Sequence, residues 1–201
     1  PGVAEGVSTE AVQARSRGRH QPRQRLSSKR RSNELSFCGK LLLYFANINF
    51  YSVIAADHVL SLSTHVLALA EHRLAPSKVE HEQKLSRYRG WQVDFKKSEP
   101  TGKTGDLACS GGLAIGHRKG FQSRPLHRLV GMEDVELGST HMHFRVFHTK
   151  RVSFLLGVVY LVNGLGMRGR NVELVTELAS VVDQCGLPYL LIGDWNMTID
   201  E

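Results

Sequence analysis

Short apolar runs separated by polar and glycine-rich stretches make up residues 40–201, whereas residues 1–33 contain few apolar side chains. The runs predict strands at 41–48, 65–71, 91–95, 111–117, 141–148, 152–161 and 189–192. The last strand follows Pro188, reads as buried on both faces and is expected to end at Gly193.

Helical spacing of apolar residues predicts a helix at 52–63, capped by Ser52, and an amphipathic helix at 171–185, with Gly186 as its C-cap glycine. Residues 77–88 form a helix or a loop, and residues 96–110 form a loop. Because a helix separates the first two strands, the sequence predicts an α/β protein in which these strands pair in parallel.

The composition is that of an ordinary globular domain, with 201 residues, of which 41% are hydrophobic and 22% charged. No apolar run approaches the roughly 18 to 20 residues that cross a bilayer, so no membrane span is expected. Cys38, Cys109 and Cys185 are odd in number and widely spaced. We therefore expect a reducing, intracellular location and no disulfide-linked partner.

The net charge of +7 is concentrated in residues 1–33, which hold eight Lys or Arg residues and two Glu. We expect this tail to be disordered and residues 34–201 to form the domain. Its sharpest feature is SSKRRS, with Lys29, Arg30 and Arg31, which suits nucleic-acid binding or nuclear import. Low-complexity sequence without a function is the alternative.

Polar residues follow the last predicted strand directly. Asp194 and Asn196 lie two positions apart, so on extended chain both side chains point to the same side. Ligands of such sheets collect beyond strand ends, where this pair could hold a phosphate oxygen, a hydrated metal or an attacking water. A plain turn is the alternative, because Gly, Asp and Asn are common turn formers.

Four stretches, in order, resemble motifs of the endonuclease/exonuclease/phosphatase superfamily. They are ANIN at 46–49, LALAEHRL at 67–74, VVYLVNG at 158–164 and GDWN at 193–196. The last matches the GDxN motif of that superfamily and contributes most. Ala70 departs from the pattern, since the family usually has Gln there. The resemblance implies a two-sheet α/β sandwich with helices outside, in four layers, like DNase I.

The resemblance also assigns roles by position. Glu71 matches the metal-binding Glu, and Asn47 would orient it or share the metal shell. Asp194 would orient or deprotonate the attacking water, and Asn196 and Tyr160 would bond the phosphate or the leaving oxygen.

Two further residues are weaker candidates for substrate contact. Asn163 follows the matched Tyr in the same motif and could support it, and His72 follows Glu71 directly, although neighbours on a strand face opposite ways. His141 and His143 are spaced as a metal pair could be, but a solvent-facing strand surface is the alternative we favour.

The implied activity is Mg²⁺-dependent phosphodiester hydrolysis, with Mn²⁺ as a second ion, and the first candidate is a DNA endonuclease of retroelement or AP-endonuclease type. The alternatives are a phosphatase acting on inositol or other small phosphate esters, and a non-catalytic remnant whose basic tail binds nucleic acid. Family members continue past the GDxN motif with an Asp and an Asp-His segment. We therefore expect residues 34–201 to be the N-terminal two-thirds of a domain, with an exposed sheet edge and no activity alone.

Overall fold

The computed structural model describes residues 40–104, 108–126 and 140–197. The predicted basic tail, with Lys29, Arg30 and Arg31, lies outside the described residues. No helix in the described ranges is long and apolar enough to cross a membrane.

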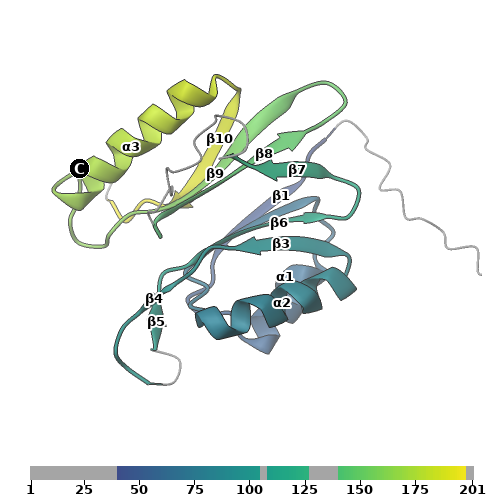
Figure 1. Cartoon of the computed structure of the whole chain (residues 1–201), viewed down its shortest axis with the longest axis horizontal. Helices are drawn as coiled ribbons and strands as arrows, with labels where there is room; N and C mark the ends of the chain where they lie inside the picture. The colour runs from purple at the N-terminus through teal and green to yellow at the C-terminus, as the bar shows by residue number, and fades with distance from the viewer. Residues whose placement is uncertain (1–39, 105–107, 127–139, 198–201) are drawn as a thin grey trace, which may run out of the picture. The chain divides into compact units, whose positions relative to one another are not determined.

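The first sheet has the strand order β1-β2-β6-β3. These strands are β1 (Leu43–Asn47), β2 (Val66–Ala70), β3 (Trp91–Phe95) and β6 (Leu113–Arg118). The predicted parallel pairing of β1 with β2 is confirmed, and β6 runs antiparallel to both of its neighbours. Helices α1 (Val53–Ser61) and α2 (Pro76–Tyr88) cover the outer face of this sheet (Figure 1). The predicted cap of α1 is confirmed, because the Ser52 hydroxyl accepts a hydrogen bond from Ala55 N at 3.1 Å.

The second sheet has the order β10-β9-β8-β7. Its strands are β7 (Gln122–Pro125), β8 (Met142–His148), β9 (Ser153–Tyr160) and β10 (Tyr189–Asp194). Here β9 and β10 are parallel and the other pairs antiparallel. Helix α3 (Arg170–Cys185) covers the outer face and ends at Gly186, which has the predicted left-handed backbone (Figure 1).

Three apolar layers hold the elements together, and they make the molecule the four-layer α/β sandwich that the resemblance implies. Strand β2 shows how, because all five of its residues are fully buried. Leu67 and Leu69 pack toward α1 and α2, whereas Val66, Ala68 and Ala70 pack between the two sheets. A strand buried on both faces reads as a continuous apolar run, which is why its pattern shows no alternation.

Three predictions about the elements need correction. Strand β7 was not predicted, because its sequence QSRP is polar and it lies at a sheet edge. The predicted loop 96–110 contains a two-residue ladder between β4 (Glu99–Pro100) and β5 (Cys109–Ser110). Gly193 does not end the last strand but lies inside β10.

Strand β10 is also not buried on both faces. Tyr189 is 58% exposed and Leu190 41%. The physical reason is its place in the sheet, since β10 is an edge strand and its apolar side chains have neighbours on one side only. A run of apolar residues does not distinguish an edge strand from a central one.

Candidate functional site

Four strands bring their carboxyl ends to the same end of the sandwich. Asn47, Tyr160 and Asp194 are the last residues of β1, β9 and β10, and Glu71 follows β2 directly. Within each sheet, parallel pairing sets the neighbours: Asn47 lies opposite Ala70, and Asp194 lies opposite Tyr160. We call Asn47, Glu71, Tyr160 and Asp194 the strand-end cluster.

Two hydrogen bonds join the strand-end cluster across the two sheets. Asn47 Nδ2 donates to Asp194 Oδ2 at 2.7 Å, although the residues are 147 positions apart. The Tyr160 hydroxyl donates to Glu71 Oε1 at 2.8 Å, across 89 positions. All four side chains are partly exposed. The fold therefore gathers two carboxylates, a carboxamide and a phenol at a surface that solvent reaches.

The backbone around the cluster is unusual. Among the described residues, the non-glycine residues with positive φ are Asn49, Glu71, Arg73 and Asn196, at 47° to 54°. Each is a cluster residue or lies two positions beyond one. Such conformations cost about 1–3 kcal/mol each and persist only where the surroundings impose them. Hydrogen bonds hold these conformations, for example from Arg73 N to Gly111 O at 3.0 Å and from Asn196 N to the Asp194 side chain at 3.1 Å.

Asn196 completes the turn after β10. Its amide N donates to Asp194 Oδ1 at 3.1 Å, and its Nδ2 donates to the carbonyl of Leu161 at 2.6 Å. Asp194 therefore uses one carboxylate oxygen for the turn and the other for Asn47. The turn and the polar site, which are alternatives in the sequence, coexist in the structure.

The charges of the cluster act on Tyr160. Burial, the hydrogen bond to Glu71 and the negative charges of Glu71 and Asp194 raise the pKa of Tyr160 to about 12, while Arg73 opposes them. Tyr160 is thus a protonated hydrogen-bond donor at neutral pH. Arg73 Nη2 lies 3.7 Å from Glu71 Oε1 and is the nearest ion-pair partner of that carboxylate in the described ranges.

The role predicted for His72 does not fit its position. Its side chain is fully buried, and its ring packs edge-on against Phe95. Nε2 bonds the carbonyl of Lys96 at 2.9 Å, and Nδ1 accepts from Leu74 N at 3.0 Å. Burial lowers the pKa of His72 to about 4. His72 is a structural residue behind the site, because the residue after a strand-end Glu points into the core.

Asn163 lies outside the strand-end cluster, exposed in the turn after β9. The residue that organises this loop is Asn171, which the sequence pattern indicates only as the start of a helix. It is fully buried; Oδ1 accepts from Val162 N, and Nδ2 donates to the carbonyls of Val162 and Gly166, at 2.8 to 3.0 Å. A polar residue at a helix start was the available signal.

His141, just before β8, and His143, within β8, lie in different surroundings and do not form one metal site. His143 Nε2 lies 3.6 Å from Asp94 between the sheets, and burial lowers the pKa of His143 to about 4. His143 is therefore not solvent-facing as we favoured, because its face of β8 packs against the other sheet. His141 stacks on Tyr160 with ring centroids 6.0 Å apart and was missed as a site residue.

The donors of the cluster fit a hard divalent cation. Glu71, Asp194 and the Asn47 carboxamide offer oxygen ligands, and Mg²⁺ prefers oxygen and keeps several waters, so that one or two carboxylates hold it. Within the described residues, no three His, Cys, Asp or Glu side chains form a metal-binding group. An ion at this site would therefore depend on water and substrate oxygens for its remaining ligands.

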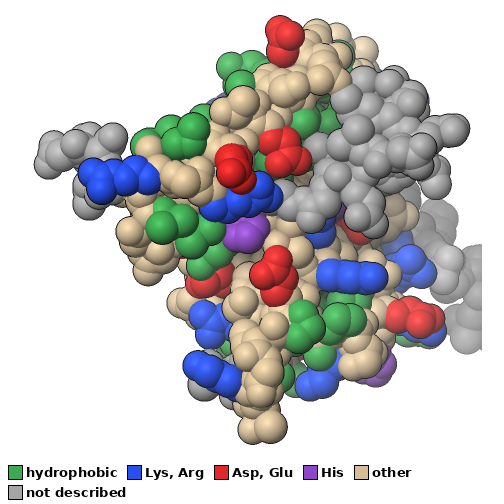
Figure 2. All heavy atoms as spheres, turned by 60° about the vertical axis from the view of Figure 1, so that its left-hand side comes forward, with side chains coloured by type: hydrophobic (Ala, Val, Ile, Leu, Met, Phe, Trp, Pro, Cys, Tyr) green, Lys and Arg blue, Asp and Glu red, His purple; other side chains and the backbone are tan. Residues whose placement is uncertain are grey.

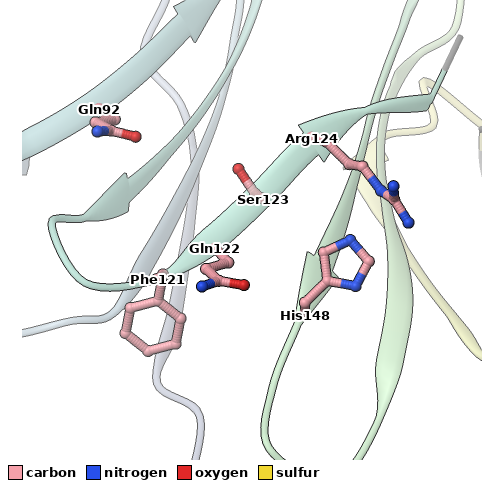
Figure 3. Close-up of a pocket in the computed structure, with 6 residues that line it drawn as sticks. All are labelled: Gln92, Phe121, Gln122, Ser123, Arg124 and His148. Atoms are coloured by element: carbon pink, nitrogen blue, oxygen red, sulfur yellow. The ribbon is translucent and has the colours of Figure 1, made fainter. Parts of the chain in front are cut away.

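Figure 2 turns this end of the sandwich toward the viewer and shows acidic, basic and histidine side chains intermixed on it. A depression of about 510 Å³ lies at the other end of the sandwich, away from the strand-end cluster, beside the start of β3 and the end of β8 (Figure 3). It is lined by Gln92, Phe121, Gln122, Ser123, Arg124 and His148. The strand-end cluster is a partly exposed polar surface at the end away from this depression.

No family model and no curated protein matches the chain. Solved structures match its fold. The 3′ phosphatase NExo from Neisseria, bound to a product DNA hairpin, is 18% identical with a TM-score of 0.51, and the match covers 78% of this chain and 58% of that one. The endonuclease domain of TRAS1, a telomere-specific non-LTR retrotransposon, is 13% identical with a TM-score of 0.49, over 80% and 61% of the two chains. The human Nocturnin catalytic domain is 16% identical with a TM-score of 0.48, over 72% and 56%. The chain spans less than two thirds of the length of each of these structures.

Proposed function

We propose that this chain, which has the fold of the endonuclease/exonuclease/phosphatase superfamily, carries the metal-binding half of a phosphodiester-hydrolysing site at its strand-end cluster. The observation that carries the proposal is the pair of cross-sheet hydrogen bonds, Asn47 to Asp194 and Tyr160 to Glu71. They join two carboxylates, a carboxamide and a phenol from four strand ends into two pairs, which supports a shared ligand site there.

Each residue type suits a part of the reaction. Phosphodiester cleavage requires charge stabilisation on the phosphoryl oxygens and a water delivered in line. Glu71 and the Asn47 carboxamide would hold Mg²⁺ or Mn²⁺, which supplies positive charge near the phosphate. Asp194 would orient the attacking water. Tyr160 and Asn196 would bond the phosphate or the leaving oxygen. Tyr160 stays protonated because its pKa lies near 12, and it would turn its single hydroxyl proton from Glu71 to that oxygen.

For the substrate we propose DNA, cleaved by an endonuclease of retroelement or AP-endonuclease type. Support comes from the basic residues Lys29, Arg30 and Arg31 and from the motif similarity of ANIN and AEHRL. The Neisseria protein of the same fold was solved with a product DNA hairpin, which makes DNA the first substrate to test. A phosphatase acting on inositol or other small phosphate esters is the second candidate, because the roles proposed for the cluster involve only a phosphate and a metal ion.

The chain spans 58% of the Neisseria structure, and metal binding at the strand-end cluster can be measured without the rest of that fold. The first experiment therefore measures metal binding. Mn²⁺ binding is followed by electron paramagnetic resonance for the wild-type chain, for Glu71→Gln, and for the matched control Glu173→Gln, which changes an exposed carboxylate of α3. We expect Glu71→Gln to weaken Mn²⁺ binding at least about 10-fold, as loss of a ligating carboxylate does, and the control to bind normally. Equal binding by all three folded proteins would overturn the metal assignment.

The second experiment measures hydrolysis of supercoiled plasmid and of a small phosphate ester, both with Mg²⁺, by wild type and Asp194→Asn. Plasmid nicking that requires Mg²⁺ and Asp194 supports the endonuclease. Hydrolysis of the ester alone supports the phosphatase. Because residues 34–201 are expected to be inactive alone, both assays use the chain extended beyond residue 201. Extended wild-type protein that binds Mn²⁺ and hydrolyses neither substrate contradicts the proposed activity and favours the remnant.

A further inference from the structure

A line of side chains leads from strand β4 to the strand-end cluster. Glu99 lies in β4, and Thr140 and His141 immediately precede β8. The Thr140 hydroxyl donates to Glu99 Oε1 at 2.6 Å, and the Thr140 hydroxyl oxygen lies 3.2 Å from His141 Nδ1. His141 in turn stacks on Tyr160. This line was not predicted from the sequence, and it ends at a phenol to which we assign phosphate contact.

The hydrogen bonds along this line fix which nitrogen of His141 carries the proton. A carboxylate only accepts hydrogen bonds, and a threonine hydroxyl has a single proton to donate. Because that proton goes to Glu99, the Thr140 oxygen must act as the acceptor toward His141. His141 Nδ1 is therefore the donor, and in the neutral ring Nε2 is the unprotonated nitrogen.

The electrostatic surroundings keep the ring neutral. Burial lowers the pKa of His141, Glu99 raises it, and the positive charges of Arg170 and Lys96 lower it further. The net effect is a pKa of His141 below the ordinary value of 6.5, so the neutral imidazole predominates at neutral pH.

His141 holds Tyr160 at two points. Its carbonyl accepts a hydrogen bond from Tyr160 N at 2.8 Å, which fixes the backbone of the last residue of β9. Its ring lies over the phenol with an interplanar angle of 26° and a centroid distance of 6.0 Å, within the range of a stacked aromatic pair. The phenol is then confined between this ring and its hydroxyl bond to Glu71.

We propose that His141, held as its Nδ1–H tautomer by Thr140 and Glu99, is a positioning residue that orients the Tyr160 ring toward the substrate phosphate. The inference rests on the proposed function for its consequence in catalysis. The orientation itself is a property of the chain and is measured without substrate. Orienting the group before the reaction is how a residue that never touches the phosphate affects the rate.

The tautomer is tested by long-range ¹H–¹⁵N nuclear magnetic resonance of the imidazole rings in the full chain. We expect the wild type and Thr140→Ser to show His141 protonated at Nδ1. Thr140→Val has the same shape without the acceptor oxygen and should shift the ring toward the Nε2–H form. A wild-type ring protonated at Nε2, or an unchanged ring in Thr140→Val, overturns the assignment.

The orientation is tested by ¹³C relaxation of the Tyr160 ring in His141→Ala and His141→Phe. We expect faster ring motion in His141→Ala and wild-type motion in His141→Phe, which keeps a stacking ring. Unchanged ring motion in a folded His141→Ala overturns the positioning role. A change in melting temperature without a change in ring motion does so as well, because it assigns His141 to stability alone.

The catalytic consequence is tested on whichever phosphate ester the wild type hydrolyses. We expect His141→Ala to lower kcat about 10-fold with KM little changed, and His141→Phe to recover most of kcat. If the ring motion changes as expected and the wild type shows no hydrolysis, the proposed function fails while the positioning role stands. If hydrolysis is normal in His141→Ala, the positioning role has no part in catalysis.

Discussion

Gly193 gives the sharpest prediction, because it lies in β10 beside Asp194 where no side chain fits. A Cβ added there would lie 2.7 Å from Val159 C and 2.9 Å from Val159 N, and closer still to the Val159 carbonyl oxygen. These are backbone atoms of the neighbouring strand β9, so they cannot turn away as a side chain would. The substitution Gly193→Ala must therefore push β10 away from β9.

The size of the effect follows from these distances. Raising the 2.7 Å contact to an ordinary carbon separation of about 3.5 Å requires the strands to part by at least roughly 0.8 Å, and relieving the closer contact with the Val159 carbonyl oxygen requires more. The bond from Leu161 N to Asp194 O, now 2.9 Å, then lengthens beyond the range of about 3.5 Å in which it counts as a hydrogen bond. Loss of two or three bonds at about 1 kcal/mol each gives a cost of about 3 kcal/mol. Asp194 moves with β10, so its 2.7 Å bond to Asn47 is also lost.

The assay is urea unfolding followed by circular dichroism, with tryptophan fluorescence as a second probe, to which Trp195 on the α3 side of the second sheet and the buried Trp91 both contribute. The matched control is Gly157→Ala in β9, whose Cβ would meet the side chains of Leu191 and Phe144 at 2.7 Å. Side chains can shift, so we expect a smaller cost there, about 1–2 kcal/mol. Gly193→Ala with stability within about 0.5 kcal/mol of wild type, or less damaging than the control, would refute the reasoning.

Three further predictions concern stability. Burial holds the pKa of His72 at about 4, against 6.5 in the unfolded chain. The free energy of unfolding should therefore fall by about 3 kcal/mol in total as the pH drops from 6.5 to about 4. In His72→Gln, the urea midpoint should depend less on pH over this window. Asn171→Ala should cost about 3 kcal/mol in urea unfolding, because it leaves buried backbone groups of Val162 and Gly166 unpaired, and a cost below about 1 kcal/mol would argue against this. Ser52→Ala should cost about 1 kcal/mol through loss of the α1 cap, whereas Ser52→Thr should cost less; equal melting temperatures for all three would contradict the role of the cap.

Much of the fold could be predicted from the sequence. Continuous apolar runs located β1, β2, β6 and β9, and the helix between the first two strands indicated their parallel pairing. What failed depended on neighbours. Whether β10 is central or at an edge is decided by which strands lie beside it, and the polar strand β7 exists because β8 offers it a partner.

The candidate site divides in the same way. The residues Asn47, Glu71, Tyr160, Asp194 and Asn196 were named from motifs, and the structure brings all five to one end of the sandwich. His72 was misplaced, because its burial depends on the packing of Phe95 and Gly112 around its ring. Asn163 lies apart for a similar reason, since the loop after β9 is shaped by the buried side chain of Asn171.

The sequence alone determined the elements, their order and the chemical groups at the strand ends, because local spacing of apolar and polar residues encodes which backbone geometry buries them. The sequence also contains Gly193 in the GDWN motif, but only the structure shows that the backbone of β9 leaves no room for a side chain there. Only the tertiary structure decided that Asn47 meets Asp194 across 147 positions, that Tyr160 meets Glu71, and that His141 lies on Tyr160. Contacts between sheets depend on register and packing over the whole molecule, and no local pattern in the chain records them.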